Sequence, residues 1–177
     1  MDYLFTLRDQ DVFIRPEFSS SEKYEKRVTV KAVVINNKGK YGFVTNPIHG
    51  FVLLAGGGAE SNDLEKEIVR ECAEELFQKV TVLSKIGIAR EFRNRNSIEY
   101  ETVCYLVKTI GELSEDTRTA DERKNGLQAL WLEEAEALRI LKKQEEKTKT
   151  GEVNFYNTAF NTIRDFRFFE EYLRSEK

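Results

Sequence analysis

Apolar and polar positions along this chain follow two different periods, and each period predicts one type of element. Short segments rich in β-branched and aromatic residues, partly alternating with polar ones, predict β-strands. These predicted strands cover residues 27–35, 41–45, 51–54, 80–89, 98–108 and 127–132. The polar residues at 36–40 predict a turn, so the first two strands are expected to form a hairpin.

Apolar residues spaced three or four positions apart predict three helices, at residues 64–77, 133–143 and 154–174. The first helix carries an apolar stripe that recurs every four residues, formed by Leu64, Ile68, Cys72 and Leu76. Either Asn62 or Asp63 is expected to cap its N-terminus. At its other end we interpret Phe77 as a core residue on a helix that continues past it, because polar residues follow directly.

The order of these elements predicts the fold class. Mixed strands and helices in this order favour an α/β or α+β sandwich over a Rossmann alternation. Two apolar pieces, 3–7 and 12–14, have the composition of strands. We therefore interpret residues 1–26 as an N-terminal strand extension and 27–177 as the main part of a single domain. The mixed-charge run 142–150 is interpreted as a mobile surface loop.

Charge and composition exclude several classes of protein. Lys and Arg number 28 and Asp and Glu number 31, so a cationic nucleic-acid binder is not expected. The apolar fraction of 40% is enough for a real core. Two cysteines, Cys72 and Cys104, exclude a disulfide framework and favour a reducing compartment. No apolar run approaches the length of a membrane span, and the charged N-terminus does not fit a signal peptide. We expect a cytoplasmic protein without a membrane partner.

The candidate chemistry lies in the glycine run at 56–58 and the helix that follows it. Glu67, Glu71, Glu74 and Glu75 are spaced three or four residues apart, which places their carboxylates on one helix face. The apolar stripe anchors the opposite face, so the acids are expected to point outward. In a chain with 33% charged residues such a face is usually only solvated. The neighbouring glycines favour instead a site for a hard cation, Mg²⁺ or Mn²⁺, that bridges to substrate phosphates.

The whole segment resembles the Nudix (MutT-like) box, G-x5-E-x7-R-E-U-x-E-E-x-G-U, in which U is apolar. The residues from Arg70 to Glu75, Arg-Glu-Cys-Ala-Glu-Glu, match its central R-E-U-x-E-E without a gap. The resemblance covers roughly residues 27–141. It implies a Nudix-like α/β/α sandwich with a mixed sheet, which here has extra N-terminal strands and a C-terminal helix.

The chain departs from the box at several positions. Asp63 is taken to stand where the family has its first Glu, which leaves the segment before Arg70 one residue short. Ala55 replaces the Pro that often precedes the glycines, and Phe77 occupies the position of the closing Gly. These departures concern the turn geometry more than the three glutamates of the central motif.

The resemblance implies a metal-dependent hydrolase that cleaves the diphosphate of a nucleoside diphosphate linked to another moiety. It implies Glu71 and Glu75 as direct ligands of Mg²⁺ or Mn²⁺, and Glu74 as a ligand or a water-orienting base. Gly56 would lend a backbone carbonyl to the metal, and Arg70 would orient a glutamate. A further acid is expected from the polar loop at 111–126, where Glu122, then Asp121, are the candidates.

Two other functions stay open at this point. One is a Nudix-like sensor that binds a nucleotide without cleaving it, and the other is a purely structural acidic helix. All box glutamates are present and no basic DNA-binding module is attached, which favours the hydrolase. The cluster Arg90, Arg93 and Arg95 either meets substrate phosphate or caps a solvated hairpin, and we favour the hairpin. A small-molecule nucleotide is the expected partner, and the N-terminal strand pieces make a homodimer possible.

Overall fold

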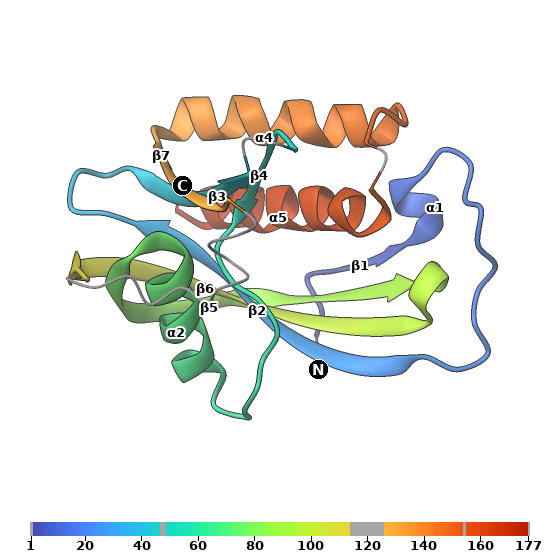
Figure 1. The fold of residues 1–177 in the computed structure, drawn as a ribbon, viewed down its shortest axis with the longest axis horizontal. Coiled ribbons are helices and arrows are strands. Elements are labelled where there is room, and N and C mark those ends of the chain that lie inside the picture. Colours follow the sequence, from blue (N-terminus) through green and yellow to red (C-terminus); the bar gives the residue numbers. More distant parts are fainter. Residues whose placement is uncertain (1, 47–48, 114–125, 154, 177) are drawn as a thin grey trace.

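A twisted β-sheet forms the centre of the molecule, with helix α2 (Leu64–Leu76) on one side and helices α4 (Glu134–Lys149) and α5 (Tyr156–Ser175) on the other (Figure 1). The structure is a computed structural model and describes residues 2–46, 49–113, 126–153 and 155–176. The strands are β1 (Phe5–Arg8), β2 (Glu25–Ile35), β3 (Tyr41–Asn46), β4 (Phe51–Leu54), β5 (Gln78–Arg93), β6 (Ile98–Glu112) and β7 (Gln128–Leu132). Across these residues, no helix has both the length and the apolar character needed to cross a bilayer.

The sheet is mixed, as the resemblance implies. Its strands follow the order β1-β5-β6-β2-β3-β4, and β7 pairs with β3. The β1–β5 and β2–β6 pairs are parallel, and the other pairs are antiparallel. The predicted hairpin forms between β2 and β3. A mixed sheet between two helical layers confirms the predicted α/β/α sandwich.

The two faces of the sheet bury two separate apolar cores. On the α2 side, alternate residues of β2 pack with the predicted helix stripe, in a cluster that includes Val30, Ala32, Val34, Ile68, Cys72 and Leu76. On the opposite side, Val33 belongs to a cluster in which residues of α4 and α5 pack against the strands. Cys72 and Cys104 are free thiols buried in these cores, in agreement with the absence of a disulfide framework.

The N-terminal residues extend the sheet at one edge. β1 pairs with β5 in parallel, from Phe5 opposite Ala89 to Arg8 opposite Phe92. The predicted strand at 12–14 is wrong, because residues Asp9–Val12 form the short helix α1. The carboxylate of Asp11 accepts a hydrogen bond from the backbone N–H of Arg8 at 2.8 Å, which closes this turn.

The predicted surface loop at 142–150 is also wrong, because α4 continues to Lys149. Two polar side chains in this run face the protein interior. Gln144 accepts a hydrogen bond from the backbone N–H of Val52 and donates one to its carbonyl, at 2.6 and 2.8 Å. Thr148 is buried against Thr162 of α5, with 3.0 Å between their hydroxyl oxygens. The helix therefore holds β4, the strand that leads into the glycine run.

Candidate functional site

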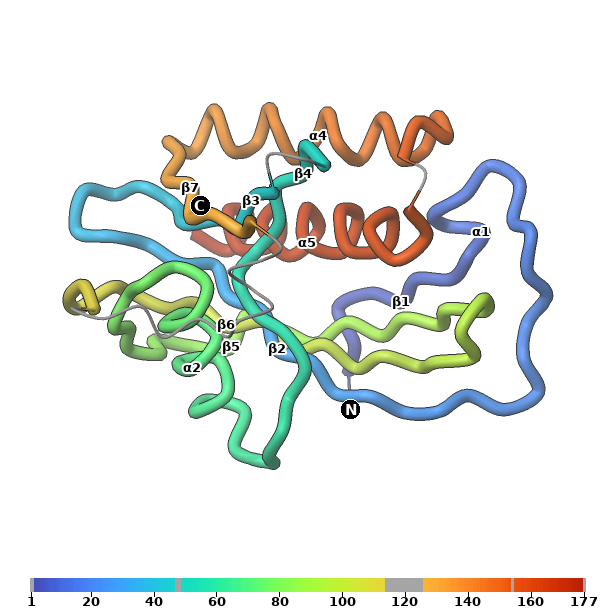
Figure 2. The backbone as a smooth tube through the Cα atoms, in the orientation of Figure 1, coloured from blue at the N-terminus to red at the C-terminus, as the bar shows by residue number. Residues whose placement is uncertain are grey.

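The glycine run joins β4 to α2 and crosses β2 on the way (Figure 2). Residues 55–59 lie antiparallel to β2: the N–H groups of Ala32 and Val30 donate to the carbonyls of Ala55 and Gly57, both at 2.9 Å. Gly56 has a φ of +129°, and a Cβ there would lie 2.1 Å from the carbonyl oxygen of Val30. Only glycine fits this position without a backbone shift. The run is thereby fixed beside the centre of the sheet.

Helix α2 begins at a side-chain cap and ends in a left-handed residue. The carboxylate of Asp63 accepts a hydrogen bond from the backbone N–H of Lys66, as an N-cap does. At the other end Phe77 has a φ of +58° and is half-buried. Our interpretation of Phe77 as part of a continuing helix is therefore wrong. The left-handed turn lets β5 start at Gln78, and the Phe77 carbonyl accepts a hydrogen bond from Leu113 at 3.0 Å.

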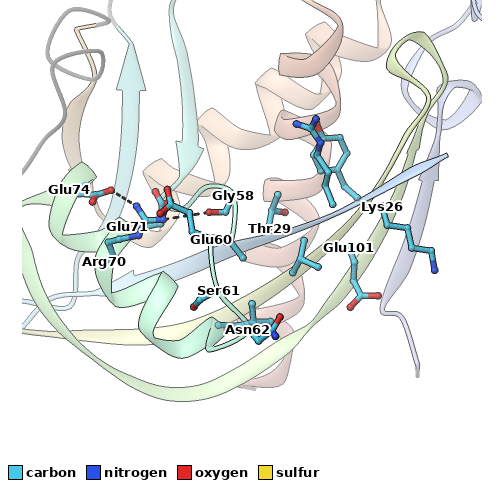
Figure 3. A pocket seen from close by; sticks show the side chains of 15 residues that line it. Lys26, Thr29, Gly58, Glu60, Ser61, Asn62, Arg70, Glu71, Glu74 and Glu101 are labelled. Carbon is cyan, nitrogen blue, oxygen red and sulfur yellow. Dashed lines mark hydrogen bonds and ion pairs between the residues drawn. The ribbon is translucent and has the colours of Figure 1, made fainter.

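Three glutamates of α2 gather around a single guanidinium group. Arg70 donates to the carboxylates of Glu74 at 2.6 Å, Glu71 at 2.8 Å and Glu67 at 3.0 Å. Figure 3 shows Arg70 between Glu71 and Glu74. Glu67 and Glu71 are each only 6% exposed, because they face the glycine run. The expectation that the acids point outward is therefore wrong for these two residues.

The glycine run contacts this carboxylate cluster directly. The backbone N–H of Gly56 donates to Glu75 Oε2 at 2.7 Å. Glu67 accepts from the Ser61 hydroxyl at 2.7 Å and from the backbone N–H of Glu60 at 3.3 Å. The structure thus brings together the described residues to which the resemblance gives a role at the metal: Gly56, Arg70, Glu71, Glu74 and Glu75. Glu122 and Asp121 lie outside the described residues.

Burial and neighbouring charges act on the cluster in opposite directions. Burial raises the pKa of the Glu71 carboxyl above its usual range, and the positive charges of Arg70 and Lys31 oppose part of this rise. The pKa of Glu67 is instead lowered, by its hydrogen bonds from Ser61 and Arg70. Two neighbouring acids on one helix face therefore differ in how readily they take up a proton.

Lys31, in the middle of β2, is a residue of this region that the sequence did not predict. Its side chain is only 8% exposed, and its Nζ donates to the carbonyls of Leu54 at 2.9 Å and Gly56 at 2.6 Å. The Gly56 carbonyl, expected to face a metal, thus accepts a hydrogen bond from an ammonium group. The available signal was a lysine inside the apolar run at residues 30–34 of this strand.

A cavity of about 1010 Å³ opens beside the cluster. At one end it is lined by Gly58, Ser61, Asn62, Arg70, Glu71 and Glu74. At the other it is lined by residues of β2 and β6, among them Lys26 and Glu101 (Figure 3). Its volume is in the range of small-molecule and cofactor sites. The acidic helix face is therefore one wall of a hollow rather than a simple solvated surface.

Comparison with known proteins identifies the fold. No family model matches the sequence, and no curated protein matches it either. A NUDIX hydrolase from Nitrosomonas europaea superimposes with a TM-score of 0.54 at 18% identity, over 81% of this chain and 89% of that chain. A MutT protein from Methanosarcina mazei Go1 gives a TM-score of 0.52 at 19% identity, over 89% and 99%. The chain has the Nudix fold.

On the Nudix fold, our placement of Asp63 at the first Glu of the box is wrong. Asp63 caps α2, has an exposed side chain and forms an ion pair with Lys66 at 2.9 Å, away from the cluster. Arg70 is the fourteenth residue after Gly56, as the box pattern requires, so the segment is not shortened. Asn62 then occupies the position of the first Glu. The acid that pairs with Arg70 from this end of the helix is Glu67.

The donors of this site suit a hard divalent cation in chemistry, because they are carboxylate oxygens. Within the described ranges, however, no three acidic, histidine or cysteine side chains converge as a ready-made ligand set. Mg²⁺ usually keeps several waters and takes one or two carboxylates together with substrate phosphates. Glu71 and Glu75, one helical turn apart, match that smaller requirement.

The arginine cluster that precedes β6 does not form a solvated hairpin cap as a whole. Arg93 is 3% exposed and donates to Glu91 at 2.6 Å and to Asn161 at 2.7 Å. Arg90 pairs with Glu99 at 2.8 Å, and Arg95 is exposed. The interpretation as a solvated cap is therefore wrong for Arg93, which belongs to a buried charge network under α5.

Proposed function

We propose that this protein is a divalent-metal-dependent hydrolase that cleaves the diphosphate of a nucleoside diphosphate linked to another moiety. One observation carries the proposal: Glu71 and Glu74 line a cavity of about 1010 Å³, and the glycine run packs against Glu71 and donates a hydrogen bond to Glu75 beside it. The same three residues stand at the glutamate positions of the Nudix box. Their spacing and the glycine contacts together exceed what a structural acidic helix needs.

Each residue of the cluster has a role that its contacts support. Glu71 and Glu75 would hold Mg²⁺ or Mn²⁺, which neutralises diphosphate charge and activates water when bound. The Gly56 N–H keeps Glu75 pointed at the glycine run. Arg70 holds Glu71 and Glu74 in place until a ligand competes for them. Glu74 is then available as a ligand or as the base that orients water, and Glu122 is proposed as an additional acid.

One observation favours the alternative of a nucleotide sensor that does not cleave its ligand. Arg70 already pairs with Glu71 and Glu74, so the carboxylates of the described region are not arranged as an open ligand set. A protein that only binds nucleotide through its cavity would tolerate this pairing. A hydrolase requires instead that metal and substrate together displace Arg70 from Glu71 and Glu74.

A product-release screen separates the two functions. The purified protein is incubated with nucleotide sugars, ADP-ribose, dinucleoside polyphosphates and oxidised purine nucleoside triphosphates, each with Mg²⁺ or Mn²⁺. We expect cleavage of a phosphoanhydride bond in at least one class and none with chelator. Binding of nucleotide without any cleavage product would establish the sensor instead.

Matched variants on α2 assign the activity to this site. Glu75→Gln and Glu71→Gln should lower kcat by orders of magnitude, because a ligand of the metal acts mainly in the transition state. Glu65→Gln is the control, because Glu65 lies on the same helix with an exposed side chain. Equal activity of all three variants would place the reaction elsewhere.

A further inference from the structure

One edge of β4 is bound by side chains from three other elements. The backbone N–H and carbonyl of Val52 both bond to the amide of Gln144, on α4. Two residues further on, the N–H of Leu54 donates to the carboxylate of Asp165, on α5, at 3.0 Å. The Leu54 carbonyl accepts from Lys31 Nζ, on β2, at 2.9 Å. A carboxylate and an ammonium thus bind the two backbone groups of Leu54, directly before the glycine run.

Asp165 is a buried acid to which the proposed reaction gives no role. Its side chain is fully buried, and burial of a carboxylate is costly unless the group is paired and hydrogen-bonded. The Oδ1 atom accepts from Arg164 Nε at 2.8 Å, and the Oδ2 atom accepts from Leu54. Arg164 in turn donates to Glu91 of β5 at 3.1 Å. The carboxylate of Asp165 is therefore held in place as an acceptor for one N–H of β4.

Lys31 extends this contact into the glycine run. Its Nζ donates to the carbonyl of Leu54 at 2.9 Å and to that of Gly56 at 2.6 Å, so two carbonyls that are two residues apart meet one ammonium. The N–H of Gly56 donates to Glu75 Oε2 on α2 at 2.7 Å. A continuous series of hydrogen bonds therefore runs from Asp165 through Leu54, Lys31 and Gly56 to Glu75.

We propose that Asp165 and Lys31 are positioning residues for Glu75. Together they fix Leu54 and Gly56, so that the N–H of Gly56 stays directed at the Glu75 carboxylate. Helix α5 is thereby coupled to the glutamates of α2, although the two helices lie on opposite sides of the sheet (Figure 1). The inference rests on the proposed function only for the role of Glu75 as a metal ligand.

Hydrogen exchange of the Gly56 amide, followed by NMR on the full chain without metal, tests the positioning directly. Lys31→Met removes both hydrogen bonds of the ammonium, and Asp165→Asn removes the charge that holds Leu54. Each should speed exchange at Gly56 by about tenfold or more, because hydrogen bonds to charged groups are lost and the run opens more easily. Lys31→Arg keeps donors for both carbonyls and should restore native exchange.

Gln144→Met is the matched control, because it frees Val52 on the same edge of β4 but does not touch the glycine run. It should lower the melting temperature and leave exchange at Gly56 within about twofold of the native rate. The comparison separates positioning of Gly56 from a general loss of strand stability.

Mn²⁺ titration separates positioning from a simple effect of charge. If Lys31 acted on the carboxylates only through its charge, Lys31→Met would tighten Mn²⁺ binding. A misdirected Glu75 should instead weaken Mn²⁺ binding by about tenfold in Lys31→Met and in Asp165→Asn, and not in Gln144→Met. On a substrate that the native protein cleaves, the first two variants should lose about tenfold in kcat with KM within about twofold.

Three results would each overturn the proposal. They are native exchange at Gly56 in Lys31→Met, an equal acceleration in Gln144→Met, and tighter Mn²⁺ binding in Lys31→Met. If Asp165→Asn does not fold, the Lys31 variants decide. A native protein that binds no Mn²⁺ and cleaves no substrate would refute the proposed function, whereas exchange at Gly56 would still decide whether Lys31 and Asp165 hold the glycine run.

Discussion

Gly57 lies directly against the carboxylate of Glu71. A Cβ at Gly57 would be 2.6 Å from Glu71 Oε1 and 3.0 Å from its Cδ. At Gly58, the next residue, a Cβ would meet no atom within 4 Å. The position of a proposed metal ligand therefore depends on the absence of one methyl group, and two adjacent glycines offer a matched test.

We expect Gly57→Ala to displace Glu71 and weaken Mn²⁺ binding and turnover by about tenfold, since small misplacements at a reacting centre are costly. The stability should change by less than about 1 kcal/mol, because the atom in the way is the end of a flexible side chain. Isothermal titration with Mn²⁺ and thermal melts measure the two effects. Gly58→Ala should match the native protein in both, and equal losses in the two variants would show that the contact with Glu71 is irrelevant.

Gly56→Ala should act on stability instead. Gly56 has a φ of +129°, and a Cβ there would lie 2.1 Å from the Val30 carbonyl oxygen. The clash is with backbone, which cannot rotate away as the end of a side chain can. Strained backbone of this kind costs about 1–3 kcal/mol before any clash is counted. We expect a loss of at least that size in urea unfolding. A variant as stable as the native protein would show that the run can move away from β2.

Variants of Phe77 test how much stability the protein loses because Phe77 stands where the box has a glycine. A non-glycine residue in left-handed geometry loses about 1 kcal/mol relative to glycine. Phe77→Gly relieves the backbone strain but loses the packing of a half-buried ring. Phe77→Ala loses the same packing and keeps the strain. Phe77→Gly should therefore melt higher than Phe77→Ala. The reverse order would mean that the left-handed geometry is not strained.

The sequence predicts the elements whose buried residues are apolar and form a regular pattern along the chain. Residues 30–34 of β2 are all buried between two helical layers and form an apolar run that only Lys31 interrupts. In contrast, the last turns of α4 are stabilised by Gln144 and Thr148, which find partners on β4 and α5. A polar side chain that is buried through a distant contact resembles a surface residue in the sequence. That is why residues 142–150 looked like a loop.

The candidate site likewise has one part that the sequence predicts and one part that it does not. The shared face of Glu71, Glu74 and Glu75 follows from their spacing on one helix. The contact of Lys31 with Gly56 joins residues 25 positions apart and depends on how the glycine run crosses β2. The left-handed Phe77 was hidden for a related reason, because the residue type argues against the geometry that the connection to β5 requires.

The buried network under α5 predicts a strong dependence on one acid. Glu91 is fully buried and accepts from Arg93 at 2.6 Å and Arg164 at 3.1 Å. Glu91→Gln leaves two buried guanidinium groups without that charge, and removing one partner of such a pair costs about 3–5 kcal/mol. Glu112→Gln, exposed at the end of β6, is the control and should be neutral. Comparable unfolding free energies for the two variants would contradict this prediction.

The same residue predicts part of the acid sensitivity. Burial alone would raise the pKa of Glu91, but Arg164 and Arg93 hold that pKa below its usual range. The stability it contributes is then present above the pKa of the unfolded chain and is lost as pH falls through the folded value. Melting temperatures between about pH 7 and pH 3 should therefore fall more steeply for the native protein than for Glu91→Gln. Parallel curves would show that Glu91 does not carry this charge.

The carboxyl of Glu71 predicts a pH dependence of stability opposite to that of Glu91, and with it a pH dependence of metal binding. Burial raises its pKa, and Arg70 and Lys31 oppose only part of the rise. At a pH between the unfolded and folded pKa values, Glu71 of the metal-free folded protein holds a proton that the unfolded chain has already lost. The stability from this group is therefore lost as pH increases from the unfolded value through the folded one. A metal ion competes with that proton, so its stabilising effect should grow over the same interval.

We expect the gap between melting temperatures with and without Mn²⁺ to widen as pH rises above the usual range of a glutamate, about 4.3. Glu71→Gln should remove this widening, and Glu65→Gln should keep it, because Glu65 is exposed on the same helix. Lys31→Gln should move it to higher pH, since the charge that opposes the burial effect is gone. A gap that is constant with pH in the native protein would mean that Glu71 does not have to lose its proton when the metal binds.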